Sequence, residues 1–116
     1  MADPADLIEV RTLQRARAIV AAGWTQGAWA VDTRGNKVIS EHPTASKRCA
    51  ASALVLGGWD DCQFSTAVRF FQKAIGTQFI GQWNDAPGRT QKEVLAKFDE
   101  AIELTKKEMC HDNGSV

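Results

Sequence analysis

Apolar residues recur at three- and four-residue steps in several stretches of the chain, which is the spacing of an amphipathic helix. The stretch 28–40 follows a different pattern, because short β segments flank a turn at Gly35-Asn36. The sequence therefore predicts an α+β fold that is mainly α, with a small β-hairpin between the first and second helices. The predicted helices span about 4–22, 45–56, 61–75 and 90–109.

Capping residues set the expected ends of the first two helices. Asp3-Pro4 supplies an N-cap acceptor and a suitable first helical residue, and Gly23 is expected to end the helix in a left-handed conformation. Thr44 or Ser46 would cap the second helix and Gly57-Gly58 would end it. Small residues cover most of its circumference, which predicts a central helix that others approach closely.

The later helices carry more explicit start signals. Asp60 and Gln63 form a variant capping box before the third helix, which is expected to end at Gly76. Thr90 and Glu93 match the Ser/Thr-x-x-Glu box before the last helix. The segment between these helices is expected to be extended or a 3₁₀ turn.

The hairpin must pack on the helices, because a two-stranded ribbon is barely stable alone. Its inward face consists either of Trp29 and Val31 or of Ala28 and Ala30, since neighbouring side chains alternate between faces. We favour Trp29 and Val31.

The totals indicate one intracellular domain. The 116 residues fit a single domain over 1–116, with a flexible tail at 110–116. No apolar run is long enough to span a membrane, and no secretory signal pattern opens the chain. The three cysteines have no spacing that predicts a disulfide framework, which favours a reducing cytoplasm. Fourteen basic residues balance fourteen acidic ones, which disfavours non-specific nucleic-acid binding.

Catalytic and metal motifs are absent from the sequence, so no cofactor is expected. The candidate nucleophile is Cys49, because Lys47, Arg48 and a helix N-terminus would lower its pKa, and His42 is its candidate base. The alternative is a buried structural cysteine in an alanine-rich helix, which we favour. Asp60-Asp61 is better explained as a helix cap than as a catalytic pair.

Tryptophans in connecting segments give the candidate binding site. Trp29 and Trp59 are expected to cover the core, whereas Trp24 and Trp83 have polar neighbours that favour a shallow, amide-lined pocket. Alternatively, these neighbours only fold a turn before the last helix. The candidate ligand-binding residues are Trp24, Gln26, Trp83, Asn84, Asp85 and Arg89.

The same stretches carry a family resemblance. WTQGAWAVDTRGN, the alanine-rich segment with its cysteine, WND, and PGRTQKEVLAKFDEAI resemble a small family of bacterial and phage proteins of unknown function. The likeness extends from Leu7 to about Leu104 and implies one cytoplasmic domain with this element order, but no reaction. Relatives often have an aromatic residue where this chain has Arg48. The positions carried over are Trp24, Gln26, Gly27, Cys49, Trp83, Asn84, Asp85, Arg89 and Thr90.

Three functions compete at this point. The favoured one is a non-enzymatic binding or accessory protein that holds a small polar ligand or a protein partner at the polar-aromatic edge. The second is a cysteine-dependent transferase or hydrolase using Cys49. The third is a structural or oligomerising module, in which exposed tryptophans join copies of the chain.

Overall fold

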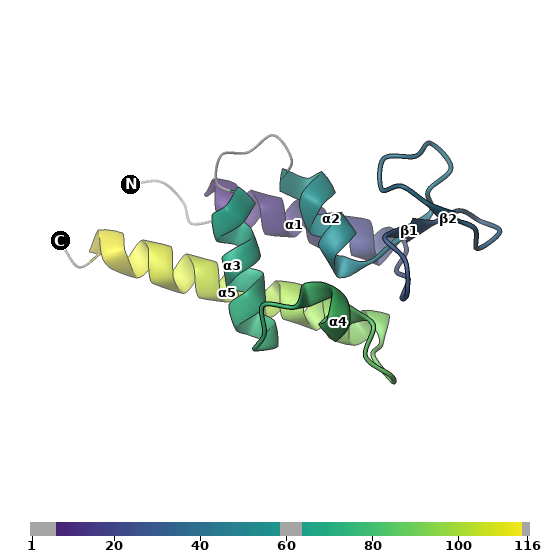
Figure 1. The fold of residues 1–116 in the computed structure, drawn as a ribbon. Helices are drawn as coiled ribbons and strands as arrows, with labels where there is room; N and C mark the ends of the chain where they lie inside the picture. Colours follow the sequence, from purple (N-terminus) through teal and green to yellow (C-terminus); the bar gives the residue numbers. More distant parts are fainter. Residues whose placement is uncertain (1–6, 59–63, 115–116) are drawn as a thin grey trace.

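A computed structural model describes residues 7–58 and 64–114. Within these ranges the chain is mainly helical with one small antiparallel sheet, which confirms the predicted fold class. Figure 1 shows the sheet at one end of the helical part, beside the start of α2. The helices are α1 (Ile8–Ala22), α2 (Ala50–Gly58), α3 (Phe64–Ile75), α4 (Ile80–Asn84) and α5 (Gln91–Gly114). The strands are β1 (Ala30–Val31), β2 (Lys37–Val38) and β3 (Lys47–Arg48).

The core forms where α1 packs against α2 and α5, and where α3 packs against α5. The predicted helical stripes supply it, and Phe71 and Phe98 meet at its centre with ring centroids 4.4 Å apart. Ala50 and Ala53 of α2 are fully buried, as expected for a helix that its neighbours approach closely. Core residues with no exposed surface include Val10, Leu13, Ala16, Val20, Ala50, Ala53, Ala67, Phe71, Val94, Phe98 and Ala101.

α1 ends at Ala22 as predicted, whereas its start and the conformation of Gly23 differ from the prediction. Its predicted cap at Asp3-Pro4 lies outside the described residues, and Leu7 occupies the N-cap position without a side-chain hydrogen bond. Gly23 has φ 173°, which is extended backbone, so the expected left-handed stop was wrong. A Cβ at this position would collide with the carbonyl oxygen of Ser46. Glycine is required here because the chain passes too close for any side chain.

The predicted hairpin is present. Ala30 pairs with Val38 and Val31 with Lys37, and the turn uses Gly35 at φ 85°. Asp32 closes this turn, because its Oδ1 accepts hydrogen bonds from two backbone N–H groups of the turn, each 2.9 Å long. The backbone N–H of residue 36 contributes most to lowering the pKa of this carboxyl group. β3 adds a third strand on the other side of β1, which the sequence did not indicate.

The hairpin presents the opposite face to the one we favoured. Ala30 is fully buried, whereas 54% of Trp29 is exposed. The alternative face, with Ala28 and Ala30, is therefore correct at the strand itself, and the expected core role of Trp29 was wrong. Alternation along a strand separates two sets of side chains but does not say which set faces inward.

The second helix begins five residues later than the predicted 45, at Ala50. Residues 47–48 lie in β3 instead, so the predicted caps at Thr44 or Ser46 were wrong. The backbone N–H of Ser46 donates to Val31 O at 2.8 Å, and that of Cys49 donates to Trp29 O at 3.0 Å. These long-range bonds hold the segment extended and override its helical propensity. Gly57-Gly58 forms the last two residues of α2.

The second half of the chain follows the prediction more closely. α3 ends just before Gly76, although its predicted cap at Asp60 and Gln63 lies outside the described residues. The segment expected to be extended or 3₁₀ instead forms the short helix α4. α5 opens on the predicted box: Glu93 N–H donates to Thr90 Oγ1 and Thr90 N–H to Glu93 Oε1, each at 3.2 Å. The helix continues to Gly114, past its predicted end at 109, and flexibility of 110–116 stays a prediction.

Candidate functional site

Asn84, the last residue of α4, is fully buried and joins three distant segments. Its Oδ1 accepts from Trp24 Nε1 at 2.7 Å and from the backbone N–H of Ala50 at 3.0 Å. Its Nδ2 donates to Thr25 O at 3.1 Å and to Asp85 Oδ1 at 2.9 Å. Because Ala50 is the first residue of α2, Asn84 caps that helix from another part of the chain.

Two further side chains fasten the same segments. Gln26 Nε2 donates to the carbonyl oxygens of Asn84 and Ala86, at 2.9 and 3.0 Å. Asp85 Oδ1 accepts from the backbone N–H of Gly27 at 2.9 Å. The hydrogen bonds of Gln26 and Asp85 therefore hold the loop after α1 against the end of α4.

Arg89, just before α5, contacts Trp83 of α4 and Glu93 of α5. Its guanidinium lies 4.1 Å from the centre of the Trp83 ring and its Nε donates to Trp83 O at 3.0 Å. It also pairs with Glu93 at 3.0 Å, and this interaction is the main cause of the lowered pKa of Glu93. The Trp83 ring meets Phe71 edge-on, with centroids 5.9 Å apart. Trp83 is thus packed between the core and a cation.

The structure brings the six candidate ligand-binding residues together and directs most of their polar atoms at one another. No buried side-chain nitrogen or oxygen in the described ranges lacks a hydrogen-bond partner. We call the set Trp24, Gln26, Asn84 and Asp85 the Asn84 network. It connects the loop after α1, the start of α2 and the end of α4.

Cys49 occupies the N-cap position of α2. It is 7% exposed, and its Sγ accepts from the backbone N–H of Ser52 at 3.4 Å. Burial raises the pKa of its thiol, and the negative charge of Asp85 adds to the rise. The candidate base His42 instead bonds Thr44, with Nδ1 2.8 Å from Oγ1. A protonated, buried thiol is a poor nucleophile.

Trp29 lines two surface hollows that the sequence did not predict, and it is the one residue that their linings share. The first has a volume of about 270 Å³ and adjoins the Asn84 network, and the second, of about 410 Å³, is mostly apolar. No sequence signal distinguished Trp29 from a core residue, because both strand faces carried apolar side chains. The first hollow is lined by Gly27, Ala28, Trp29, Cys49, Ala51, Gly81 and Asp85. The second is lined by Trp29, Val38, Ile39, Ser40, Glu41 and Val55.

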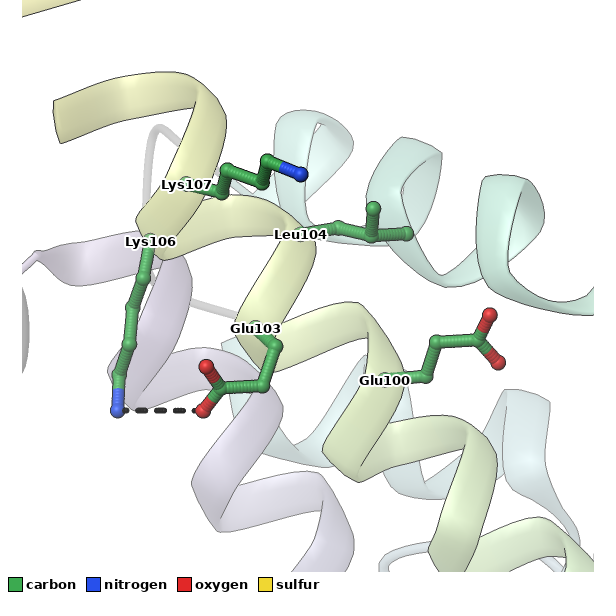
Figure 2. A pocket seen from close by; sticks show the side chains of 5 residues that line it. All are labelled: Glu100, Glu103, Leu104, Lys106 and Lys107. Atoms are coloured by element: carbon green, nitrogen blue, oxygen red, sulfur yellow. Dashed lines mark ion pairs between the residues drawn. The ribbon is translucent and has the colours of Figure 1, made fainter. Parts of the chain in front are cut away.

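A third hollow, of about 540 Å³, lies along α5 and has a different character. Figure 2 shows Glu100, Leu104 and Lys107 on one side of the helix, while Glu103 and Lys106 lie on the other. The latter two pair at 3.8 Å. Alternating charges at helical spacing are typical of a solvated face, and no groups converge here on a common point.

The described ranges hold neither a metal cluster nor a membrane-spanning helix. No group of three or more histidine, cysteine or acidic side chains is placed there to hold a metal ion. None of the helices described has the length and apolar character needed to cross a membrane.

Comparison with known proteins gives a family and no activity. The model of a family of unknown function, DUF6197, matches residues 6–104. No match was found among curated proteins or among solved structures. The matched region includes the Asn84 network, both hollows beside Trp29 and most of α5. The chain therefore belongs to the DUF6197 family of unknown function.

Proposed function

We propose that the protein is a non-enzymatic binding module that takes an apolar side chain of a protein partner into the hollow between Trp29 and Ile39. One observation carries this proposal: 54% of Trp29 and 66% of Ile39 are exposed, and both line the same 410 Å³ hollow. Large apolar side chains gathered around a concave surface are typical of interaction sites, and tryptophan is enriched among the residues that dominate binding energy.

Hydrogen bonds connect the segments that surround this hollow. Ser40 Oγ and Ser52 Oγ share a buried hydrogen bond of 2.5 Å, which ties the hairpin to α2. Arg48 Nε donates to Ser40 O at 3.0 Å, and the carbonyl of Trp29 accepts from Cys49 N–H. A site whose frame is fixed before binding loses less conformational entropy when a partner arrives.

The Asn84 network supports this function because it fixes the position of the loop before Trp29. Its side chains hold the loop that leads into Trp29 against α2 and α4. We assign Trp24, Gln26, Trp83, Asn84 and Arg89 a positioning role rather than direct contact with a ligand. A buried free thiol at Cys49 is compatible with the cytoplasmic location that we propose.

Selection from a random-peptide phage library tests the proposal and does not require the partner to be identified first. We expect peptides with a large apolar residue to be enriched on the wild-type protein and to lose binding to Trp29→Ala and Ile39→Asp. Phe79→Ala is the matched control, since Phe79 is 55% exposed but does not line the hollow, and it should leave binding intact. Far-UV circular dichroism verifies that each variant is folded.

Two results would overturn the proposal. One is the absence of any enriched peptide, and the other is enrichment that survives Trp29→Ala. The mass of the protein in solution shows whether a second copy of the chain occupies the hollow instead. Sedimentation should give a mass near 12.7 kDa, whereas a dimer that Ile39→Asp dissociates would assign the hollow to a second copy of the chain.

A further inference from the structure

We infer that the other hollow lined by Trp29 binds a lysine or arginine side chain of the same partner, next to its apolar anchor. This inference rests on the proposed function and specifies the partner's chemistry. Trp29 lines both hollows, so a segment that places an apolar side chain in one hollow brings a neighbouring side chain close to the other.

Charge favours a basic side chain. The residues lining the two hollows include two carboxylates, Asp85 and Glu41, and no lysine or arginine. One arginine and one lysine adjoin this lining in sequence. Arg48 directs its Nε to the carbonyl of Ser40, and Lys37 precedes Val38, which lines the apolar hollow. A cationic group is therefore attracted to the hollow that contains Asp85, whereas an acidic one is repelled.

Asp85 is held with one oxygen available. Its Oδ1 accepts from Gly27 N–H and from Asn84 Nδ2, both at 2.9 Å, which fixes the orientation of the carboxylate. Its Oδ2 has no hydrogen-bond partner among the residues that the structure describes, and the residue is exposed. An oriented carboxylate oxygen forms a charge-assisted hydrogen bond with an ammonium or guanidinium group without first having to be ordered.

The other walls suit a long basic side chain. The indole of Trp29 offers a surface for the aliphatic stem and for a cation–π contact. The hollow of about 270 Å³ lies just below the roughly 300–1,000 Å³ of pockets that enclose small-molecule ligands. One side chain of a larger partner is the occupant that matches this size and lining.

The test compares two forms of the tightest selected peptide, one with its basic residue and one with norleucine at that position. Norleucine keeps an aliphatic stem and lacks the charge. We expect wild-type protein to bind the basic form about three- to tenfold more tightly, since an exposed ion pair and a cation–π contact are each modest. About 0.5 M salt should reduce this preference, because the charges are screened.

Asp85→Asn should bring the ratio close to one, while Glu103→Gln, at an exposed position on α5, should leave it unchanged. Asparagine retains an Oδ1 acceptor for Gly27 N–H and Asn84 Nδ2, so the fold is expected to persist. Should Asp85→Asn not fold, the norleucine comparison on wild-type protein decides the question alone.

The outcomes separate the two proposals. Selected peptides that lack a basic residue near the apolar anchor, or equal binding of both peptide forms while binding still depends on Trp29, overturn this inference and leave the binding function standing. Failure to select any Trp29-dependent peptide overturns both. A preference for the basic form that is unaltered in a folded Asp85→Asn variant shows that the cation binds elsewhere and refutes the assignment to Asp85.

Discussion

Replacing Asn84 by alanine tests whether the Asn84 network stabilises the fold. The substitution removes all four side-chain hydrogen bonds of a residue with no exposed surface. The backbone N–H of Ala50, also fully buried, loses its acceptor, and so does the half-buried indole N–H of Trp24. Water reaches the indole more readily than it reaches the buried helix terminus.

The magnitude follows from these two stranded donors. A buried donor without a partner costs about 1–3 kcal/mol, so Asn84→Ala should lower the free energy of unfolding by about 2–5 kcal/mol. Domains of this kind are stable by only about 5–15 kcal/mol in total. With a urea m-value of about 1.5 kcal/mol/M, a loss of about 3 kcal/mol moves the unfolding midpoint down by about 2 M.

Urea denaturation followed by far-UV circular dichroism measures this change. Gln82→Ala is the matched control, because Gln82 is an exposed side chain on the same helix, and it should shift the free energy of unfolding by less than about 0.5 kcal/mol. In a Trp24→Phe background one of the stranded donors no longer exists, so Asn84→Ala should cost about 1–2 kcal/mol less than in the wild type. An Asn84→Ala variant as stable as Gln82→Ala would refute the reasoning.

Three further predictions concern other parts of the molecule. Gly23→Ala should destabilise the protein by about 1–3 kcal/mol, because the added Cβ overpacks against the chain. Gly81→Ala has open space at its Cβ and should stabilise helix α4 by about 0.5–1 kcal/mol. Thermal unfolding of the two variants measures both changes. The pKa of Glu93 is lowered in the folded state, so its carboxylate stabilises the fold above the unfolded pKa of about 4.5. This stabilisation is lost as the pH falls through the folded pKa. Glu93→Gln should therefore lose less stability in acid than the wild type does. With the other two cysteines replaced by serine, the buried Cys49 thiol should react with iodoacetamide near neutral pH at least about tenfold more slowly than a free cysteine, and rapid labelling would support the nucleophile hypothesis instead.

Helix identity was predictable because it depends on local information. The apolar stripes of α1, α3 and α5 repeat over several turns, and the Thr90–Glu93 box specifies the start of α5 from four consecutive residues. The hairpin also has a local signal, in its glycine-containing turn. Each of these elements appears where the pattern indicated, and α1 and α3 also end at the predicted residues.

Features that depend on distant partners were not predictable in the same way. β3 replaces the expected first turn of the second helix, because the backbone N–H of Ser46 is bonded to Val31 and that of Cys49 to Trp29. The inward face of the hairpin depends on what the strand packs against, and the alternation of side chains carries no information about this. The surface around Trp29 was missed for the same reason.

The sequence singled out six candidate site residues and left open whether they bind a ligand or fold a turn, and ligand binding by them stays a prediction. The polar and aromatic residues chosen from the sequence do lie together, but their pattern along the chain does not indicate whether their polar groups face a ligand or one another. That distinction rests on hydrogen bonds between residues as far apart as Trp24 and Asn84. Those bonds exist only once the whole chain is folded.

The capping of α2 by Asn84 has a consequence for folding kinetics. The cap connects residues 34 positions apart, and the indole bond to the same oxygen spans 60 positions. Closing such long loops costs chain entropy before the contact offsets it, so we expect these bonds to be weak in the folding transition state. Loss of the Asn84 side chain should therefore accelerate unfolding much more than it slows folding, which makes this residue a determinant of how long the native state persists.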